Sequence, residues 1–124
     1  MLTNKKILIT GAAGFIGSYL AKALLEHHNY LILVDNFNEY YSGKEDRLNA
    51  VLEDYQSKKD FILLKEDILD PKLYEKLDQN IEYIFHLAAQ ANVRHSIKHA
   101  SEVSKTNIIG TVNLLEFAKQ IKDL

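Results

Sequence analysis

The sequence predicts an α/β fold in which helices cover both faces of a parallel sheet. Two observations lead to this prediction. Short, almost continuously apolar runs alternate with longer amphipathic stretches along the whole chain, as they do in α/β proteins. A glycine-rich run also follows the first apolar run directly, at the point where such folds turn from a strand into a helix. The elements can therefore be assigned in order along the chain.

Strands are expected at the short apolar runs. These runs are Lys6 to Thr10, Tyr30 to Asp35, Asp60 to Lys65 and Glu82 to Leu87. Continuous rather than alternating apolar character is typical of strands that are buried on both faces. The runs therefore favour a parallel sheet.

Helices are expected between and after these strands. They are Gly14 to Glu26, Glu45 to Ser57, Pro71 to about Leu77, and about Ser101 to Ile121. Asp70 can cap the third helix, because Pro71 then occupies the first helical position, where no N–H donor is needed. The faces predicted to lie on the sheet are Ile16, Leu20, Ala23 and Leu24 in the first helix and Val103, Ile108, Val112, Leu115 and Ala118 in the last. Gly110 is a predicted weak point of the last helix.

Composition favours one ordinary domain with a small-molecule partner. The chain has 124 residues, 47% of them hydrophobic, which suffices for one domain core. Its net charge of −2 and scattered basic residues argue against nucleic acid or an anionic membrane surface as partner. Cysteine, a membrane-spanning apolar stretch and a signal-like start are all lacking, so a cytoplasmic location is expected.

The glycine-rich run indicates a dinucleotide site. Gly11 permits a tight turn, Gly14 lets backbone N–H groups approach a pyrophosphate, and Gly17 lets the helix pack closely. Asp35 ends the second strand about 20 residues on, where a carboxylate can accept hydrogen bonds from a ribose 2′-hydroxyl. Since this carboxylate would repel a 2′-phosphate, NAD is favoured over NADP. The structural alternative is a tight glycine turn with Asp35 as a solvated strand end.

Several motifs along the chain resemble those of the extended short-chain dehydrogenase/reductase family. The segments are Thr10 to Gly17, Asp35 to Asn38, Asp67-Ile68, His86 to Gln90, and Asn107 to Thr111. Within that family the chain is similar to NAD-dependent nucleotide-sugar epimerases and dehydratases. The stretch Val34 to Tyr41 with Arg47-Leu48 resembles UDP-glucuronate 4-epimerases most, while UDP-galactose 4-epimerases and nucleotide-sugar 4,6-dehydratases share much of the rest.

This resemblance implies a partial Rossmann-like, doubly wound sheet in the order 3-2-1-4. One NAD-binding domain would span residues 1–124, truncated and without a substrate domain. The implied contacts to pyrophosphate come from Gly11, Gly14, Phe15, Ile16 and Gly17; to the adenosine from Asp35, Asn36, Asn38, Asp67 and Ile68; and to the nicotinamide half from Leu87, Ala88, Ala89, Gln90 and Asn107. The alternatives are that Leu87 to Ala89 form only a strand end and that Asn107 is a solvated helix residue.

The chain departs from many relatives at two places. Asn92 stands where relatives carry glycine, in the turn Ala91 to Arg94, and asparagine is expected to preserve a left-handed backbone there. Ala100 and Val103 replace proline and an aromatic residue, which puts the entry to the last helix in doubt.

No catalytic residue is predicted within this chain. The resemblance implies a Ser/Thr and a Tyr-x-x-x-Lys pair beyond the next strand, past Leu124, so the chain alone is not expected to catalyse. Tyr40-x-x-x-Lys44 and Tyr55-x-x-x-Lys59 have the right spacing but lie between the second and third strands, and Tyr55 fits the core face of its helix. His95 and His99 lack a third ligand nearby in sequence, so no metal site is predicted.

Three functional hypotheses remain open. The chain can be the NAD-binding portion of a nucleotide-sugar epimerase or dehydratase, acting on a nucleotide sugar only with another chain. It can be a stand-alone NAD-binding or regulatory module, or a structural interaction protein without catalysis. The fourth strand is expected at an exposed sheet edge, and this predicts self-association or a partner chain.

Overall fold

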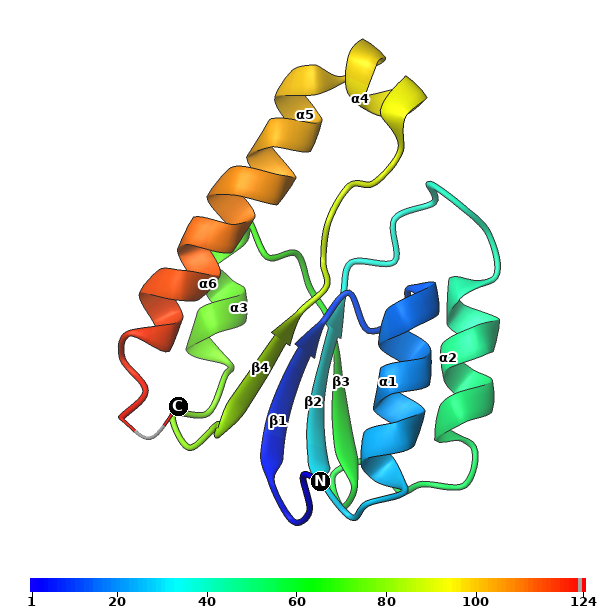
Figure 1. Cartoon of the computed structure of the whole chain (residues 1–124), viewed down its shortest axis with the longest axis vertical. Helices are drawn as coiled ribbons and strands as arrows, with labels where there is room; N and C mark the ends of the chain where they lie inside the picture. Colours follow the sequence, from blue (N-terminus) through cyan, green and yellow to red (C-terminus); the bar gives the residue numbers. More distant parts are fainter. Residues whose placement is uncertain (123) are drawn as a thin grey trace.

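The computed structural model describes residues 1–122 and 124, and it contains one parallel sheet with helices on both faces (Figure 1). The strands are β1 (Lys6–Thr10), β2 (Tyr30–Asp35), β3 (Phe61–Lys65) and β4 (Tyr83–His86). Each lies at or within one residue of its predicted bounds. The order is β3-β2-β1-β4, which confirms the predicted topology.

The register brings the carboxyl ends of the strands to one edge of the sheet. Thr10 at the end of β1 pairs with Val34 on one side and with His86 on the other. Asp35 at the end of β2 pairs with Lys65. Because strand order reverses at β1, the crevice above this edge is where doubly wound folds bind ligands.

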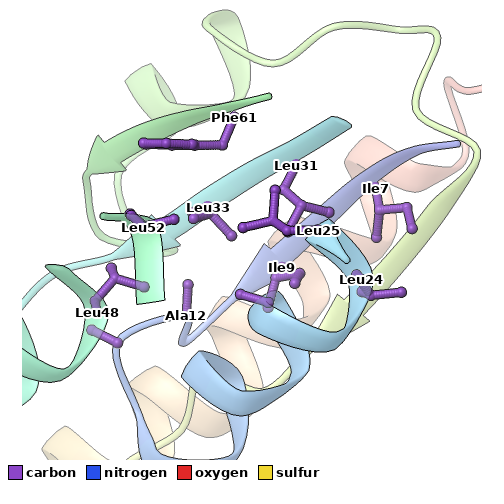
Figure 2. Packing of buried hydrophobic residues seen from close by; sticks show 12 residues of the cluster. Ile7, Ile9, Ala12, Leu24, Leu25, Leu31, Leu33, Leu48, Leu52 and Phe61 are labelled. Carbon is purple, nitrogen blue, oxygen red and sulfur yellow. The ribbon is translucent and has the colours of Figure 1, made fainter. Parts of the chain in front are cut away.

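One face of the sheet is covered by α1 (Phe15–Leu25) and α2 (Lys44–Leu52). Ile7 and Ile9 of β1 and Leu31 and Leu33 of β2 point into this layer and are fully buried (Figure 2). The α2 helix is shorter than predicted, since it ends at Leu52 rather than near Ser57. Tyr55, just beyond, packs against this core as expected.

Half of the predicted core face of α1 is wrong, because Leu20 and Leu24 pack on the core but Ile16 and Ala23 do not. Ile16 is 67% exposed and Ala23 is also exposed, whereas Gly17, Ser18, Ala21, Leu24 and Leu25 are buried. The rotation follows from Gly17, because a Cβ there would lie 2.2 Å from the Gly11 carbonyl oxygen. The one residue without a side chain must therefore face the turn, and the larger Ile16 faces outward.

The other face of the sheet is covered by α3 (Pro71–Glu75) and α6 (Gly110–Ala118). Asp70 caps α3, with its side chain accepting from the Lys72 N–H at 2.9 Å, as predicted. The α6 helix continues α5 (Ala100–Ser104) through a π-helical turn, η1 (Lys105–Ile109).

The predicted core face of the last helix is wrong at three of its five residues, while Val103 and Ala118 are half-buried. Leu114 and Phe117 are buried, whereas Ile108, Val112 and Leu115 are 60%, 46% and 58% exposed. This helix is apolar on several sides, so periodicity alone cannot select the packed face. Gly110 selects it, because a Cβ at Gly110 would lie 2.4 Å from Ile68 Cδ1. The predicted weak point is thus a position where the helix packs directly on Ile68.

A short helix, α4 (Val93–Lys98), was not predicted and lies at the end of a long connection from β4 (Figure 1). Asn92 caps it by accepting from the His95 N–H at 3.1 Å. Asn92 does not take the expected left-handed conformation: its φ of 156° and ψ of 120° lie in a region that glycine tolerates far better. None of the helices within the described residues is long and apolar enough to cross a membrane.

Candidate functional site

A cavity of about 300 Å³ lies above the carboxyl edge of the sheet. It is lined by most of the residues that the sequence predicted for a dinucleotide, namely Gly11, Gly14, Phe15, Ile16, Gly17, Asp35, Asn36, Asn38, Asp67, Ile68, Leu87, Ala88, Ala89 and Gln90. These residues come from four separate stretches of the chain. The fold therefore brings the predicted site residues together, with Asn107 as the exception.

The glycine turn leaves no room for a side chain at Gly11. Gly11 has a φ of +72°, and a Cβ there would lie 2.7 Å from the Leu87 carbonyl carbon and the Ala88 nitrogen. The turn therefore touches the segment that follows β4. Gly14 precedes α1, so the first N–H groups of that helix have no intrahelical partners and can bind an anion.

Asp35 holds the glycine turn to the loop after β2. Its Oδ2 accepts from the Ala13 N–H at 2.9 Å and its Oδ1 accepts from the Phe37 N–H at 2.8 Å. The carboxylate is only 9% exposed. Each oxygen has a further lone pair, so the group can still accept a bond from a sugar hydroxyl. Asp35 is thus a structural part of the cavity wall and not a solvated strand end.

Asn36, Asn38 and Asp67 form the next part of this wall. The Asn36 amide donates to Asp67 Oδ2 at 3.0 Å, and Asn36 Oδ1 accepts from the Asn38 N–H at 3.1 Å. Asp67 Oδ1 also accepts from the Leu69 N–H at 2.8 Å. These bonds fix the loops after β2 and β3 against each other on the side where the adenosine is expected.

Sequence reasoning missed several residues of the lining. They are Val34, Tyr40, Tyr41, Lys44, Glu66, Ala91 and Thr106. Lys44 is 9% exposed, and its ammonium donates to the Asn38 carbonyl and side-chain oxygens and lies 4.5 Å from the Tyr41 ring centroid. Burial lowers the pKa of Lys44, and the charge of nearby Asp35 acts in the opposite direction.

A signal for Tyr40 and Lys44 was present in the sequence, because they form the first Tyr-x-x-x-Lys spacing. The structure places this pair on the wall that Asp35 and Asn38 also line. Gly43, between them, takes a φ of +81° and begins α2. The rejection of this pair as catalytic rests on its place in the chain between β2 and β3, away from the proposed nicotinamide end, and stays a prediction.

Asn107 does not line the cavity but contacts it indirectly. Its side-chain oxygen accepts from the Gln90 N–H at 2.8 Å, and its amide donates to the Gln90 carbonyl at 3.0 Å. Asn107 therefore holds the backbone of a lining residue from outside. The solvated-helix alternative is excluded by these two bonds.

The histidine pair considered as metal ligands is stacked. The rings of His95 and His99 lie 4.4 Å apart, and that of His95 also meets Tyr40 at 4.8 Å. Among residues 1–122 and Leu124, no three or more histidine and carboxylate side chains form a group that could hold a metal ion.

The parallel sheet in the order β3-β2-β1-β4, the glycine turn and the acid that ends β2 define a doubly wound, Rossmann-like α/β fold. Comparison with known proteins identifies the family. Residues 8–124 match the family model described as GDP-mannose 4,6 dehydratase. The chain belongs to this family of nucleotide-sugar epimerases and dehydratases, as the sequence motifs indicated.

Individual relatives agree with this placement. The chain is 42% identical to Protein CapI of Staphylococcus aureus, with 92% of this chain and 34% of CapI covered. It is 37% identical to UDP-glucuronate 4-epimerase 4 of Arabidopsis thaliana, covering 93% of this chain and 26% of that protein. The enzyme WbmF of Bordetella bronchiseptica, solved with NAD+ and UDP, superposes with a TM-score of 0.83 at 28% identity, covering 99% of this chain and 34% of WbmF. The chain thus spans about a third or less of the length of these relatives.

Proposed function

We propose that this chain binds NAD, as the cofactor-binding portion of a nucleotide-sugar epimerase or dehydratase. The observation that carries the proposal is the cavity above the sheet edge, whose walls are the glycine turn, Asp35 and the segment from Leu87 to Gln90. In this proposal the pyrophosphate lies at the start of α1 and the adenine near Ile68. The nicotinamide half lies along Leu87 to Gln90. WbmF, with the same fold, was solved with NAD+ bound.

The same site is proposed to prefer NAD to NADP. The Asp35 carboxylate faces the position where the adenosine ribose is expected, and a 2′-phosphate there would meet a buried negative charge. Lys44 offsets part of this charge, but it already donates to two oxygens of Asn38. A hydroxyl, which can donate to the carboxylate, fits better than a phosphate.

Titration calorimetry tests the binding proposal. Wild-type chain is titrated with NAD and with NADP, and Asp35→Ala is titrated with NAD. We expect saturable binding of NAD at one site, at least tenfold weaker binding of NADP, and loss of NAD binding in the variant. Absence of NAD binding at millimolar concentration in a chain with a folded circular dichroism spectrum would overturn the proposal.

Catalysis by these residues alone is not proposed. The wall from Leu87 to Gln90 carries aliphatic side chains and one amide, and none of these can take a proton from a sugar hydroxyl. UDP-glucuronate and UDP-galactose are the substrates to assay, given the resemblance of the sequence to the 4-epimerases of these two nucleotide sugars. Turnover by the chain alone would contradict this part of the proposal. A cytoplasmic location stays a prediction from the sequence.

A role in interaction is the second candidate, and the exposed apolar face of the last helix favours it. Ile108, Ile109, Val112 and Leu115 are all at least 46% exposed, on the side away from Leu114 and Phe117. We propose that this face, with the edge of β4, binds a second copy or a partner polypeptide. Light scattering tests self-association: Leu115→Ser should shift the chain toward monomer. A wild-type chain that is monomeric at high concentration would exclude the second copy.

A further inference from the structure

A chain of side-chain hydrogen bonds runs beneath the cavity and joins three elements. His86, the last residue of β4, lies between two hydroxyls: its Nδ1 is 2.6 Å from Thr10 Oγ1 of β1, and its Nε2 is 2.9 Å from Thr111 Oγ1 of α6. Thr10 directly precedes the glycine turn. The ring therefore connects the turn to the helix that covers the opposite face of the sheet.

Both ends of this series of hydrogen bonds reach the backbone of the cavity wall. On one side, Thr10 Oγ1 accepts from the Ala88 N–H at 3.3 Å. On the other, the Thr111 hydroxyl donates to the Asn107 carbonyl at 2.7 Å, and the Asn107 side chain holds Gln90. Ala88 and Gln90 belong to the wall on which the nicotinamide half is proposed to lie.

The directions of these bonds determine the proton position on His86. Because the Thr111 hydroxyl donates its one proton to the Asn107 carbonyl, its oxygen can only accept from His86, so Nε2 carries the proton. In a neutral ring Nδ1 is then an acceptor, and the Thr10 hydroxyl donates to it. Every donor in this series of hydrogen bonds then has one acceptor.

We propose that His86 is a positioning residue, which as the neutral Nε2–H tautomer fixes the nicotinamide-side wall of the cavity to β1 and α6. The proposal rests on the NAD site proposed above, but its geometric part concerns the free protein. Protonation of Nδ1 would make the ring a donor to Thr10, so the Thr10 hydroxyl would have to turn its own proton away from the ring and accept from both the ring and the Ala88 N–H.

The surroundings of the ring favour the neutral form. Its hydrogen-bond partners on the elements packed against it are the uncharged hydroxyls of Thr10 on β1 and Thr111 on α6, and no ion pair involves the ring among the described residues. Burial lowers the pKa of His86 below its ordinary value of 6.5. The Thr10 hydroxyl therefore donates to the ring at neutral pH, and the direction of this hydrogen bond reverses in acid.

Nuclear magnetic resonance of the wild-type chain without ligand tests the geometry. Long-range ¹H–¹⁵N spectra should show the Nε2–H tautomer for His86 at pH 7.5. On acidification the amide signals of Ala88 and Gln90 should shift with the same midpoint as the ring. An Nδ1–H tautomer, or amide signals that do not follow the ring, would overturn the proposal whether or not NAD binds.

Three substitutions separate positioning from general packing. His86→Phe keeps an aromatic ring without either hydrogen bond, His86→Asn keeps an acceptor near the Nδ1 position, and His86→Gln keeps a donor near the Nε2 position. We expect NAD binding to weaken about tenfold in His86→Phe, the effect of roughly one lost buried hydrogen bond. The Ala88 amide shift should recover in His86→Asn and the Gln90 shift in His86→Gln.

Ligand and pH controls keep failure of this proposal distinct from failure of the NAD proposal. ADP contains only the adenosine diphosphate half, so its affinity should change less than twofold in His86→Phe, and NAD affinity of the wild type should fall below pH 6.5 while that of the variant does not. Equal losses for ADP and NAD, or a pH profile unchanged by His86→Phe, would show a merely structural role and refute positioning. Absence of NAD and ADP binding at pH 7.5 would refute the NAD site, leaving the tautomer and amide results to decide this inference.

Discussion

The two halves of the sheet differ in how completely their surfaces are covered. Between β1 and α2, the strands are buried almost throughout and Asp35 ties the glycine turn to the following loop. From β4 onward, α4, α5 and η1 contain no buried residue, and the wall from Leu87 to Gln90 is held by a few polar contacts. The strands of the first half are thus more completely buried, whereas the second half leaves apolar side chains of the last helix exposed.

We expect the largest effect from a substitution that disturbs the contact between the glycine turn and the segment after β4. Gly11→Ala would push a Cβ into the backbone of Leu87 and Ala88 at a positive φ, and we expect it to cost on the order of 4 kcal/mol of unfolding free energy. Gly43→Ala is the matched control, since it has a φ of +81° but no atom within 4 Å of the added Cβ. It should cost about 1 kcal/mol. Urea unfolding measures both; equal costs would show that close approach of the halves is unimportant.

Asp35→Asn tests whether the stability of the first half, from β1 to α2, depends on the Asp35 carboxylate. An amide would turn one NH₂ group toward the Ala13 or Phe37 N–H, leaving a buried donor without an acceptor. We expect a loss of about 3 kcal/mol in urea unfolding, the range for hydrogen bonds to a charged group. The exposed Asp54→Asn should change stability by less than about 0.5 kcal/mol. A similar small change at Asp35 would mean that the carboxylate serves ligand binding alone.

Asn92→Gly should stabilise the part of the molecule from β4 onward, at the start of α4. The backbone of Asn92 costs on the order of 1–3 kcal/mol for a residue with a side chain, whereas replacing an asparagine cap by glycine costs only a few tenths. We expect a net gain of about 1 kcal/mol and slower amide hydrogen exchange in α4. Faster exchange there would show that the cap outweighs the backbone strain.

The smallest effects concern ion pairs, and they should still differ between the halves. Glu45 pairs with Lys65 at 2.6 Å with both side chains more than half exposed, so Glu45→Gln should cost less than about 0.5 kcal/mol. Glu82 instead accepts from Lys5 Nζ at 2.7 Å and from the Lys6 N–H at 3.0 Å, which joins the chain before β4 to the start of β1. Glu82→Gln should cost more than Glu45→Gln in the same experiment.

The contribution of the Glu82 carboxylate to folding stability should depend on pH in a defined direction. Its hydrogen bonds with Lys5 and the Lys6 backbone lower its pKa below the ordinary 4.5. The carboxylate thus stabilises the fold above pH 4.5, and this stability is lost as the pH falls through the lowered pKa. Glu82→Gln should flatten the acid part of the stability profile of the wild type. A profile that this substitution leaves unchanged would contradict the role of the Glu82 carboxylate.

Sequence patterns predicted the strands well because continuous apolar runs bounded by turns restrict the possible elements strongly, and the resemblance to a known family supplied the strand order. The patterns predicted the packed faces of α1 and of the last helix only in part. In both cases a glycine decides the rotation, Gly17 against the Gly11 carbonyl and Gly110 against Ile68. Such close contacts depend on the three-dimensional arrangement, and periodicity does not contain them.

The sequence predicted most of the residues that line the cavity but missed others and the way in which they are held. Motif residues such as Asp35 and Asn38 do line the cavity, because the register of parallel strands brings their carboxyl ends together. Lys44 was missed as a lining residue because its ammonium enters the wall only through its bonds to Asn38. The role of Asn107 also depends on long-range contact, since it holds Gln90 across 17 residues of chain.

Calorimetric titration of the folded 124-residue chain with NAD at pH 7.5 tests the central claim most directly. The account predicts saturable binding with a stoichiometry of one, lost in Asp35→Ala and in Gly11→Ala. A folded wild-type chain that binds no NAD at millimolar concentration, or an Asp35→Ala chain that binds as tightly as wild type, would contradict it.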